Sequence, residues 1–336
     1  MAATRENFRI AVTGDYEDLA LQVAEWNSLG LDVQVVSFKE PFRSAQETVN
    51  ALLGFDAITL MRERTLISRQ ILEQLPRLKL IVFTGPSNAT LDSAAAIERH
   101  ITVCNAIMAG ARPSSPLPSG GGSPAELTLA LMLACAWHIP AADARIRSGG
   151  WSFQPGIPLR GKTLGIVGYG NIGKPVARYG QALGMNIAAF SRGLTEQAAS
   201  ADGVSKADLP TLLRTSDVVS IHLPLNSSTT GMIGVREIDA MKPGVILVNT
   251  ARAPIVDQAA MLAALRAHKI AMAGLDVFDQ EPLPTGHPLL RLDNVVMTPH
   301  IGYVTKGSLT DMYAAVLEVL AAYRQGIIKN RYTPVT

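Results

Sequence analysis

The sequence has few of the features that mark disulfide-rich, metal-binding or nucleic-acid-binding proteins. Only two cysteines occur in 336 residues, Cys104 and Cys135, and both stand among apolar neighbours, which predicts buried free thiols and no metal site. Lys and Arg number 30 against 28 Asp and Glu, for a net charge of +2. This balance lacks the clustered basic excess that nucleic-acid binding requires, so we expect no nucleic-acid partner.

Long apolar runs are lacking as well. The longest, "LTLALMLACAW" (127–137), is far shorter than the ~18 residues of a membrane span. The start of the chain, "MAATRENFRIAVTG", carries charges where a secretory signal has its apolar stretch. We therefore expect a cytoplasmic protein without a membrane partner. Apolar residues make up 48% of the chain, and its length predicts about two domains of roughly 100–200 residues each.

Short apolar runs bounded by Gly, Pro, Asn or Asp recur along the chain and alternate with segments of helical length. Such runs are typical of strands buried on both faces, and their alternation with helices predicts parallel βαβ units in an α/β fold. The clearest runs are residues 78–83, 163–168, 185–190, 217–223, 245–249, 272–278 and 294–299, and weaker ones occupy 8–14, 31–38, 56–61 and 101–105.

The two α/β regions are joined by "MAGARPSSPLPSGGGSP" (108–124), whose Pro, Ser and Gly content predicts a loop or hinge. A helix is expected to follow it, with Ser123 as N-cap, Pro124 in the first position and Glu126 three residues after the cap. This helix is apolar on more than one face. It is therefore either a core helix or a dimer contact.

A dinucleotide-binding turn is predicted by "LGIVGYGNIGKPVARYG". Gly168 would permit a tight turn, Gly170 would let a pyrophosphate approach the backbone, and Gly173 would let helix and strand pack closely. The next strand ends in Ser191 and Arg192, with no adjacent carboxylate for the ribose hydroxyls of NAD. An arginine there accommodates the extra phosphate of NADP, so the pattern favours NADP(H) within NAD(P).

Three charged or titratable residues follow late strands of the same region: Arg252, Glu281 and His300. Ligands bind at the carboxyl edge of a parallel sheet, so these side chains are expected to converge beside the nicotinamide. Each could instead have a structural role, as an ion-pair partner, a turn residue and a loop histidine. Their occurrence together behind the glycine turn favours catalysis.

With these residues the sequence resembles the D-isomer-specific 2-hydroxyacid dehydrogenases, through "GIVGYGNIG", "HLPLNSSTTGMI", "VILVNTARAPIVD", "AGLDVFDQEPLP" and "VVMTPHIG". The resemblance implies two Rossmann-like or flavodoxin-like domains with doubly wound parallel sheets and an active site in the cleft between them. Residues 1–106 and 303–336 would form the substrate domain and residues 107–302 the cofactor domain. It also implies a homodimer built on the cofactor domain.

The resemblance also assigns roles, for the interconversion of a 2-oxo acid and a D-2-hydroxy acid by hydride transfer. His300 would be the general acid and base, Glu281 would favour the protonated imidazole, and Arg252 would bind the substrate carboxylate and polarise its carbonyl. Asp276 would fix the nicotinamide carboxamide. The other residues implied at the cofactor are Asn171, Ile172, Leu223, Pro224, Thr229, Thr250 and Ala251, and those implied at the substrate are Arg62, Gly85, Pro86 and Ser87.

Some positions depart from the family pattern. Ser87 stands where a second glycine is usual, and Pro86 offers no N–H to a carboxylate.

Two other functions on this fold remain as alternatives. A formate dehydrogenase has a neutral amide at the position of Glu281, so the glutamate argues against that function. No residue excludes a cofactor-sensing binding protein like the C-terminal-binding corepressors.

Overall fold

The computed structural model describes residues 7–107 and 122–333. The chain divides into two compact units. Unit 1 contains the described residues up to 107 and those from Thr305 onward, and unit 2 contains the described residues from 122 to Val304. Most of the predicted hinge, residues 108–124, lies outside the described residues. The predicted tasks of the two units, substrate binding and cofactor binding, stay predictions.

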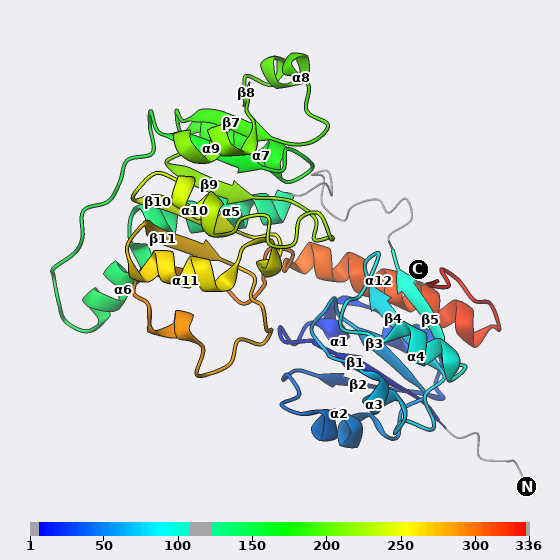
Figure 1. The fold of residues 1–336 in the computed structure, drawn as a ribbon. Helices are drawn as coiled ribbons and strands as arrows, with labels where there is room; N and C mark the ends of the chain where they lie inside the picture. The colour runs from blue at the N-terminus through cyan, green and yellow to red at the C-terminus, as the bar shows by residue number, and fades with distance from the viewer. Residues whose placement is uncertain (1–6, 108–121, 334–336) are drawn as a thin grey trace, which may run out of the picture. The chain divides into compact units, whose positions relative to one another are not determined.

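Unit 1 is built on a five-stranded parallel sheet of order β2-β1-β3-β4-β5 (Figure 1). The chain moves from β1 to one neighbour, β2, and then crosses to the other, β3, so the sheet changes direction between β1 and β3. The strands are β1 (Phe8–Thr13), β2 (Val33–Phe38), β3 (Ala57–Leu60), β4 (Leu80–Thr84) and β5 (Thr102–Ala106).

Helices cover both faces of this sheet. One face packs against the helices that follow β2, β3 and β4, and the other is covered by the C-terminal helix, which contacts β4, β5 and α1. The elements are α1 (Ala20–Val23), η1 (Trp26–Leu29), α2 (Ala45–Leu52), α3 (Arg69–Leu72), α4 (Ser93–Glu98) and α12 (Lys306–Arg324). The chain end therefore completes the core begun by its first hundred residues.

Unit 2 is built on a seven-stranded parallel sheet of order β12-β11-β10-β9-β6-β7-β8 (Figure 1). Its direction changes between β6 and β9, the position at which open α/β sheets bind ligands. The strands are β6 (Thr163–Val167), β7 (Asn186–Phe190), β8 (Ser205–Lys206), β9 (Val218–Ile221), β10 (Val245–Asn249), β11 (Ile270–Leu275) and β12 (Val295–Met297).

Two apolar clusters lie on the two faces of this sheet, so the unit is doubly wound. Neighbours along β9 alternate between them, with Val218 in one cluster and Val219 in the other. The helices are α5 (Gly122–Ala136), α6 (Ile139–Arg147), α7 (Gly173–Ala182), α8 (Glu196–Ala201), α9 (Leu209–Thr215), α10 (Val235–Ala240) and α11 (Gln258–Arg266), with short turns η2 (Ala253–Ile255) and η3 (Pro288–Arg291).

Helix α5 is a core helix, packed against α7, β10 and β11. It already includes Gly122 and Ser123, so the prediction of Ser123 as N-cap is wrong, while Pro124 does lie in the first turn. No single helix in the described ranges is long and apolar enough to cross a membrane, and α5 and α6 reach that length only as a pair bent by 63°.

The predicted fold class, with two doubly wound parallel sheets, is confirmed, and a strand occupies every predicted run. The prediction missed β8, because Ser205 and Lys206 are exposed and carry no apolar pattern. Both cysteines are buried free thiols as expected. Burial raises the pKa of Cys104 to about 11 and that of Cys135 to about 12, so neither is a reactive thiolate at neutral pH.

An aspartate joins the strands at the amino edge of each sheet in the same way. Asp56 precedes β3 and accepts from the N–H of Arg9 (3.1 Å). Asp217 precedes β9 and accepts from the N–H of Thr163 (2.8 Å) and the ammonium of Lys242 (3.1 Å). Partial burial alone would raise the pKa of Asp217, but the Thr163 N–H and Lys242 hold it below its usual value. The ionised carboxylate therefore stabilises the folded sheet.

We predict that Asp217→Asn lowers the free energy of unfolding by about 1–2 kcal/mol at neutral pH, since it removes a charge-assisted contact at a partly exposed site. Because the folded-state pKa is depressed, the contribution of Asp217 is present above its unfolded pKa of about 3.9 and is lost as the pH falls through the folded value. Denaturant titrations should show the two proteins converging below about pH 4. A gap that persists in acid would contradict this explanation.

Candidate active site and cofactor-binding turn

In the glycine turn after β6, Gly168 and Gly173 are packed against other backbone atoms, whereas Gly170 is open to solvent or a ligand. Gly168 has φ +108°, and a Cβ on it would lie 2.6 Å from the carbonyl oxygen of His222. A Cβ on Gly173 would collide with the carbonyl oxygen of Gly168. By contrast, a Cβ on Gly170 would have no heavy atom within 4 Å. Two glycines are thus required by packing, and the third leaves the backbone accessible.

Helix α7 begins directly behind this turn. Its N-cap is Ile172, which makes no side-chain cap hydrogen bond, and Asn171 precedes it within the turn. An uncapped helix N-terminus presents backbone N–H groups and the positive end of the helix dipole to an anion. The turn and α7 therefore fit the pyrophosphate of a dinucleotide, as the sequence predicts.

The end of β7 lies beside the glycine turn, because Gly168 donates its N–H to the carbonyl oxygen of Phe190 (2.8 Å). Ser191 and Arg192 follow at once; Ser191 is half-buried and Arg192 is exposed. An exposed guanidinium here can meet a 2′-phosphate on the adenosine ribose. The geometry is compatible with NADP(H) and shows no carboxylate directly after the strand.

The segment after β9 also borders the turn and contains Leu223, Pro224 and Thr229. The hydroxyl of Thr229 donates to the carbonyl oxygen of Pro224 (2.7 Å) and accepts from the N–H of Asn226 (2.9 Å). Thr229 is buried. It therefore shapes the loop that follows β9, whatever else it contacts.

His222, in the same segment, was not singled out from the sequence. Its Nε2 lies 2.8 Å from the hydroxyl oxygen of Ser220, and its Nδ1 is buried with no hydrogen-bond partner within the described residues. Burial lowers the pKa of His222 to about 3, so the ring is neutral at physiological pH. A buried unpaired nitrogen is unusual, and this one stands beside the glycine turn, where a bound cofactor would bring polar groups.

Arg252 follows β10 in a turn that Asn249 holds. The side chain of Asn249 accepts from the N–H of Ala251 (3.0 Å) and donates to the carbonyl oxygen of Arg252 (3.1 Å). The guanidinium donates to the carbonyl oxygen of Ala251 (2.8 Å). Thr250 shares a hydrogen bond with Thr128 of α5 (2.9 Å), which sequence reasoning did not identify. The turn is thus fixed before any ligand binds.

His300 and Glu281 share a hydrogen bond, with Nδ1 2.7 Å from Oε2. The other oxygen of Glu281 accepts from the N–H of Phe278 (2.9 Å), which fixes the carboxylate. Tyr303 packs edge-on against the imidazole at 5.8 Å. The two side chains are 21% and 28% exposed, so the pair can reach a ligand. The sequence predicted this pairing only through the family resemblance.

Asp276 organises the loop that carries His300. One oxygen accepts from the hydroxyl of Thr298 (2.6 Å) and the N–H of Ile301 (2.8 Å), and the other accepts from the N–H of Gly302 (2.9 Å). The residue is 1% exposed. Burial raises the pKa of Asp276, against the opposing effect of these three hydrogen bonds and of nearby His300.

The backbone of His300 explains why this loop needs such an anchor. Its φ is +54°, a left-handed conformation that a residue with a side chain rarely adopts and that costs of order 1 kcal/mol. His300 donates its N–H to the carbonyl oxygen of Thr298 (3.0 Å), and the next two N–H groups bind Asp276. These contacts hold the strained turn.

The residues predicted to bind substrate in unit 1 follow β3 and β4. Arg62 has φ +51° and donates its N–H to the hydroxyl of Thr84 (2.8 Å). A Cβ on Gly85 would collide with the Arg62 guanidinium, so the guanidinium lies against this glycine. The N–H of Gly85 is bonded to the carbonyl oxygen of Ala106 (3.2 Å). Pro86 and Ser87 are exposed. Because the N–H of Gly85 is already bonded and proline has none, Ser87 is the residue of this turn whose N–H is proposed for a carboxylate.

Comparison with known proteins identifies the family. Residues 129–302 match the family described as D-isomer specific 2-hydroxyacid dehydrogenase, NAD binding domain. The glyoxylate reductase of Thermococcus litoralis is 38% identical over 282 residues, which cover 81% of each chain. The chain belongs to the D-isomer-specific 2-hydroxyacid dehydrogenase family. It is thus a member of a family of oxidoreductases that act on CH–OH groups, as the sequence motifs predict.

Other relatives show how far the likeness extends. The D-3-phosphoglycerate dehydrogenase of Archaeoglobus fulgidus is 37% identical over 301 residues, but these span 89% of this chain and only 54% of the relative. The crystal structure of a phosphoglycerate oxidoreductase from Vibrio cholerae superposes with a TM-score of 0.84 at 32% identity, covering 95% of this chain and 99% of that one. The two-domain dehydrogenase fold is therefore shared along nearly the whole chain.

Proposed function

We propose that the protein is an NAD(P)-dependent oxidoreductase that interconverts a 2-oxo acid and a D-2-hydroxy acid. The observation that carries the proposal is the His300–Glu281 pair, 2.7 Å apart, at the carboxyl edge of the sheet that also carries the glycine turn. Arg252, Glu281 and His300 follow β10, β11 and β12, which are adjacent strands. Family membership supports the same chemistry.

His300 acts as the general acid in reduction and as the base in oxidation. Because Nδ1 faces Glu281, Nε2 is the nitrogen that gives its proton to the carbonyl oxygen of the substrate as hydride arrives at C2. Glu281 fixes the ring orientation and stabilises the protonated imidazole. The nicotinamide, when bound, supplies or accepts the hydride.

Arg252 binds the substrate carboxylate and polarises the adjacent carbonyl, because a guanidinium offers paired donors of the geometry that a carboxylate accepts. Arg62 and the N–H of Ser87 are the substrate-binding candidates of unit 1. When the cofactor is bound, Asp276 would also hold the nicotinamide carboxamide. A carboxylate has about four acceptor sites, and Asp276 uses three of them within the protein.

The cofactor is NAD(P)(H), with a preference for NADP(H). Two features support the preference. Arg192 is exposed close after the end of β7, and neither of the two residues that follow this strand is the Asp or Glu that would bind the ribose hydroxyls of NAD. Gly168, Gly170, Asn171, Ile172 and Gly173 form the turn that would hold the pyrophosphate. The segment from Leu223 to Thr229 and the residues Thr250 and Ala251 line the rest of the site.

One kinetic panel tests this function: the purified protein, NADPH or NADH, and a set of 2-oxo acids, followed by loss of reduced-cofactor absorbance. We expect turnover of at least one 2-oxo acid, with a lower KM for NADPH than for NADH. A clear preference for NADH would contradict the role of Arg192. Cofactor binding without turnover of any 2-oxo acid would instead favour a cofactor-sensing binding protein.

The matched control in the panel is His300→Gln, which keeps a polar side chain of similar size but cannot donate a proton as imidazolium does. Its turnover should fall by roughly 10²–10⁴-fold, the usual contribution of general acid catalysis, while cofactor affinity measured by fluorescence titration stays near wild type. Wild-type turnover in this variant would remove His300 from the mechanism.

We also propose that the protein is a homodimer formed through unit 2. Helix α6 buries none of its residues within the chain. Exposed apolar side chains gather just before it, on it and after it, namely Trp137, Ile139, Ile146, Trp151 and Phe153. Trp151 is 82% exposed. Such a concentration of exposed aromatic and aliphatic surface is typical of an interaction site.

Size-exclusion chromatography with light-scattering detection tests the dimer directly, and we expect the mass of two chains. The double change Trp151→Ser, Phe153→Ser should shift the mass towards one chain, because both side chains are exposed within the chain and would be buried only at the interface. A wild-type protein with the mass of one chain would contradict the proposal.

A further inference from the structure

The sheet of unit 1 changes direction between β1 and β3, so the loops after these two strands border the position where an open α/β sheet takes its ligand. The loop after β1 begins Gly14-Asp15-Tyr16-Glu17, and the segment after β3 begins Met61-Arg62-Glu63-Arg64. Two arginines and two glutamates thus meet at this edge. How their charges are paired decides which ligand the edge accepts.

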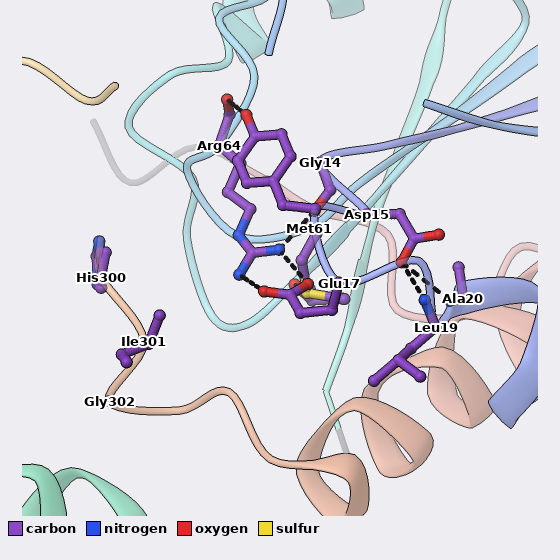
Figure 2. A network of polar contacts seen from close by, with 12 residues as sticks. Gly14, Asp15, Glu17, Leu19, Ala20, Met61, Arg64, His300, Ile301 and Gly302 are labelled. Carbon is purple, nitrogen blue, oxygen red and sulfur yellow. Dashed lines mark hydrogen bonds and ion pairs between the residues drawn. The ribbon is translucent and has the colours of Figure 1, made fainter. Parts of the chain in front are cut away.

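Arg64 is fully engaged by the opposite loop (Figure 2). Its Nη1 donates to Oε2 of Glu17 (2.8 Å) and its Nη2 donates to Oε1 (2.7 Å), a two-point contact across 47 residues of sequence. The guanidinium also donates to the carbonyl oxygen of Gly14 (2.5 Å). Arg64 is 9% exposed and Glu17 is 20% exposed. A ligand approaching the pair therefore meets the carboxylate more readily than the guanidinium.

Close packing keeps Arg64 in this position. Its guanidinium lies over the ring of Tyr16 at 4.9 Å, and the Tyr16 hydroxyl donates to the carbonyl oxygen of Arg64 (3.1 Å). Gly14 has φ +75°, and a Cβ there would lie 2.9 Å from Cβ of Arg64. The glycine thus allows the two loops to approach, and a longer residue would separate them.

The loop after β1 is itself held rigidly. Asp15 is fully buried and accepts from the N–H groups of Leu19 (2.9 Å) and Ala20 (3.0 Å) (Figure 2). Its second oxygen accepts from the hydroxyl of Ser37 at the end of β2 (2.5 Å). Glu17 stands between these fixed points, so the backbone of the loop holds it opposite Arg64.

The second arginine also has an acidic neighbour, since Nε of Arg62 lies 3.7 Å from Oε2 of Glu63. A substrate with one carboxylate places a single negative charge in the site. A second anionic group, such as a phosphate or another carboxylate, needs a further cation. Arg64 would be that cation at this edge, but its charge and its paired donors are already used by Glu17.

We propose that the Glu17–Arg64 pair is a specificity determinant that selects 2-oxo acids with an uncharged side chain over those with a second anionic group. The inference rests on the proposed function and names the substrate class for it. An incoming phosphate would face the more exposed carboxylate of the pair, and like charges repel. We therefore expect a substrate without a phosphate, as the name of the glyoxylate reductase implies, rather than a phosphorylated one, as the name of the phosphoglycerate dehydrogenase implies.

The experiment compares kcat/KM for hydroxypyruvate and 3-phosphohydroxypyruvate, which differ only in the phosphate. For the wild-type protein we expect the unphosphorylated acid to be preferred by at least about tenfold, the effect of one charge-assisted contact. A preference for the phosphorylated acid overturns the inference and leaves the proposed function standing. If no 2-oxo acid of the panel is turned over, the proposed function itself is contradicted.

Three variants assign the preference to the pair. Glu17→Gln keeps the side-chain shape but releases Arg64 from its counter-charge, and should shift the ratio towards the phosphorylated acid by about tenfold. Glu17→Gln combined with Arg64→Gln removes that cation as well and should lose the gain. Glu73→Gln, a change of the same charge on the exposed end of α3, should leave the ratio unchanged.

The ratio of two substrates on one protein is insensitive to partial loss of folded enzyme, because both values fall together. An unchanged ratio in Glu17→Gln overturns the inference, as does an equal gain in the double variant. If Glu17→Gln lowers the melting temperature too far for assay, a salt titration of the wild-type protein decides. Discrimination by charge weakens as salt screens it, whereas a salt-independent preference would overturn the inference.

Discussion

The buried carboxylate of Asp276 is the constraint on which the active site depends. It gathers the N–H groups of Ile301 and Gly302 and the hydroxyl of Thr298, and these contacts hold His300 in a left-handed turn that is strained by itself. With its backbone fixed, the imidazole presents Nδ1 to Glu281 and leaves Nε2 for a substrate. Preorganisation of this kind lowers the cost of orienting a catalytic group.

The same arrangement occurs in both units: after a strand ends, one polar side chain forms hydrogen bonds that fix the turn that follows. Asn249 does so for Arg252, Asp276 does so for His300, and Asp15 does so for Glu17. Of these three anchors, only Asp276 is proposed to touch a ligand, yet each determines where a neighbouring charge stands. The positions of the charged side chains at the sheet edges are therefore determined by neighbouring polar residues that hold the backbone.

Apolar periodicity was enough to predict most of the fold. Runs such as residues 245–249 became strands because branched apolar side chains fill both faces of a covered sheet. The exposed pair Ser205–Lys206 in β8 gave no such signal. The glycine turn was predictable because spacing and flanking elements are local. The contacts of Thr128 with Thr250 and of Glu17 with Arg64 were not, since they join residues far apart in sequence whose types are equally common on a solvated surface.

Hydrogen exchange of the Ile301 and Gly302 amides, without any cofactor, is the sharpest test of the anchoring by Asp276. We expect slow exchange in the wild-type protein and markedly faster exchange in Asp276→Asn, whose amide cannot accept from both positions. The exposed change Asp239→Asn should leave both rates unaltered. Equal protection of the two amides in Asp276→Asn and the wild-type protein would show that the loop carrying His300 is held by something other than this carboxylate.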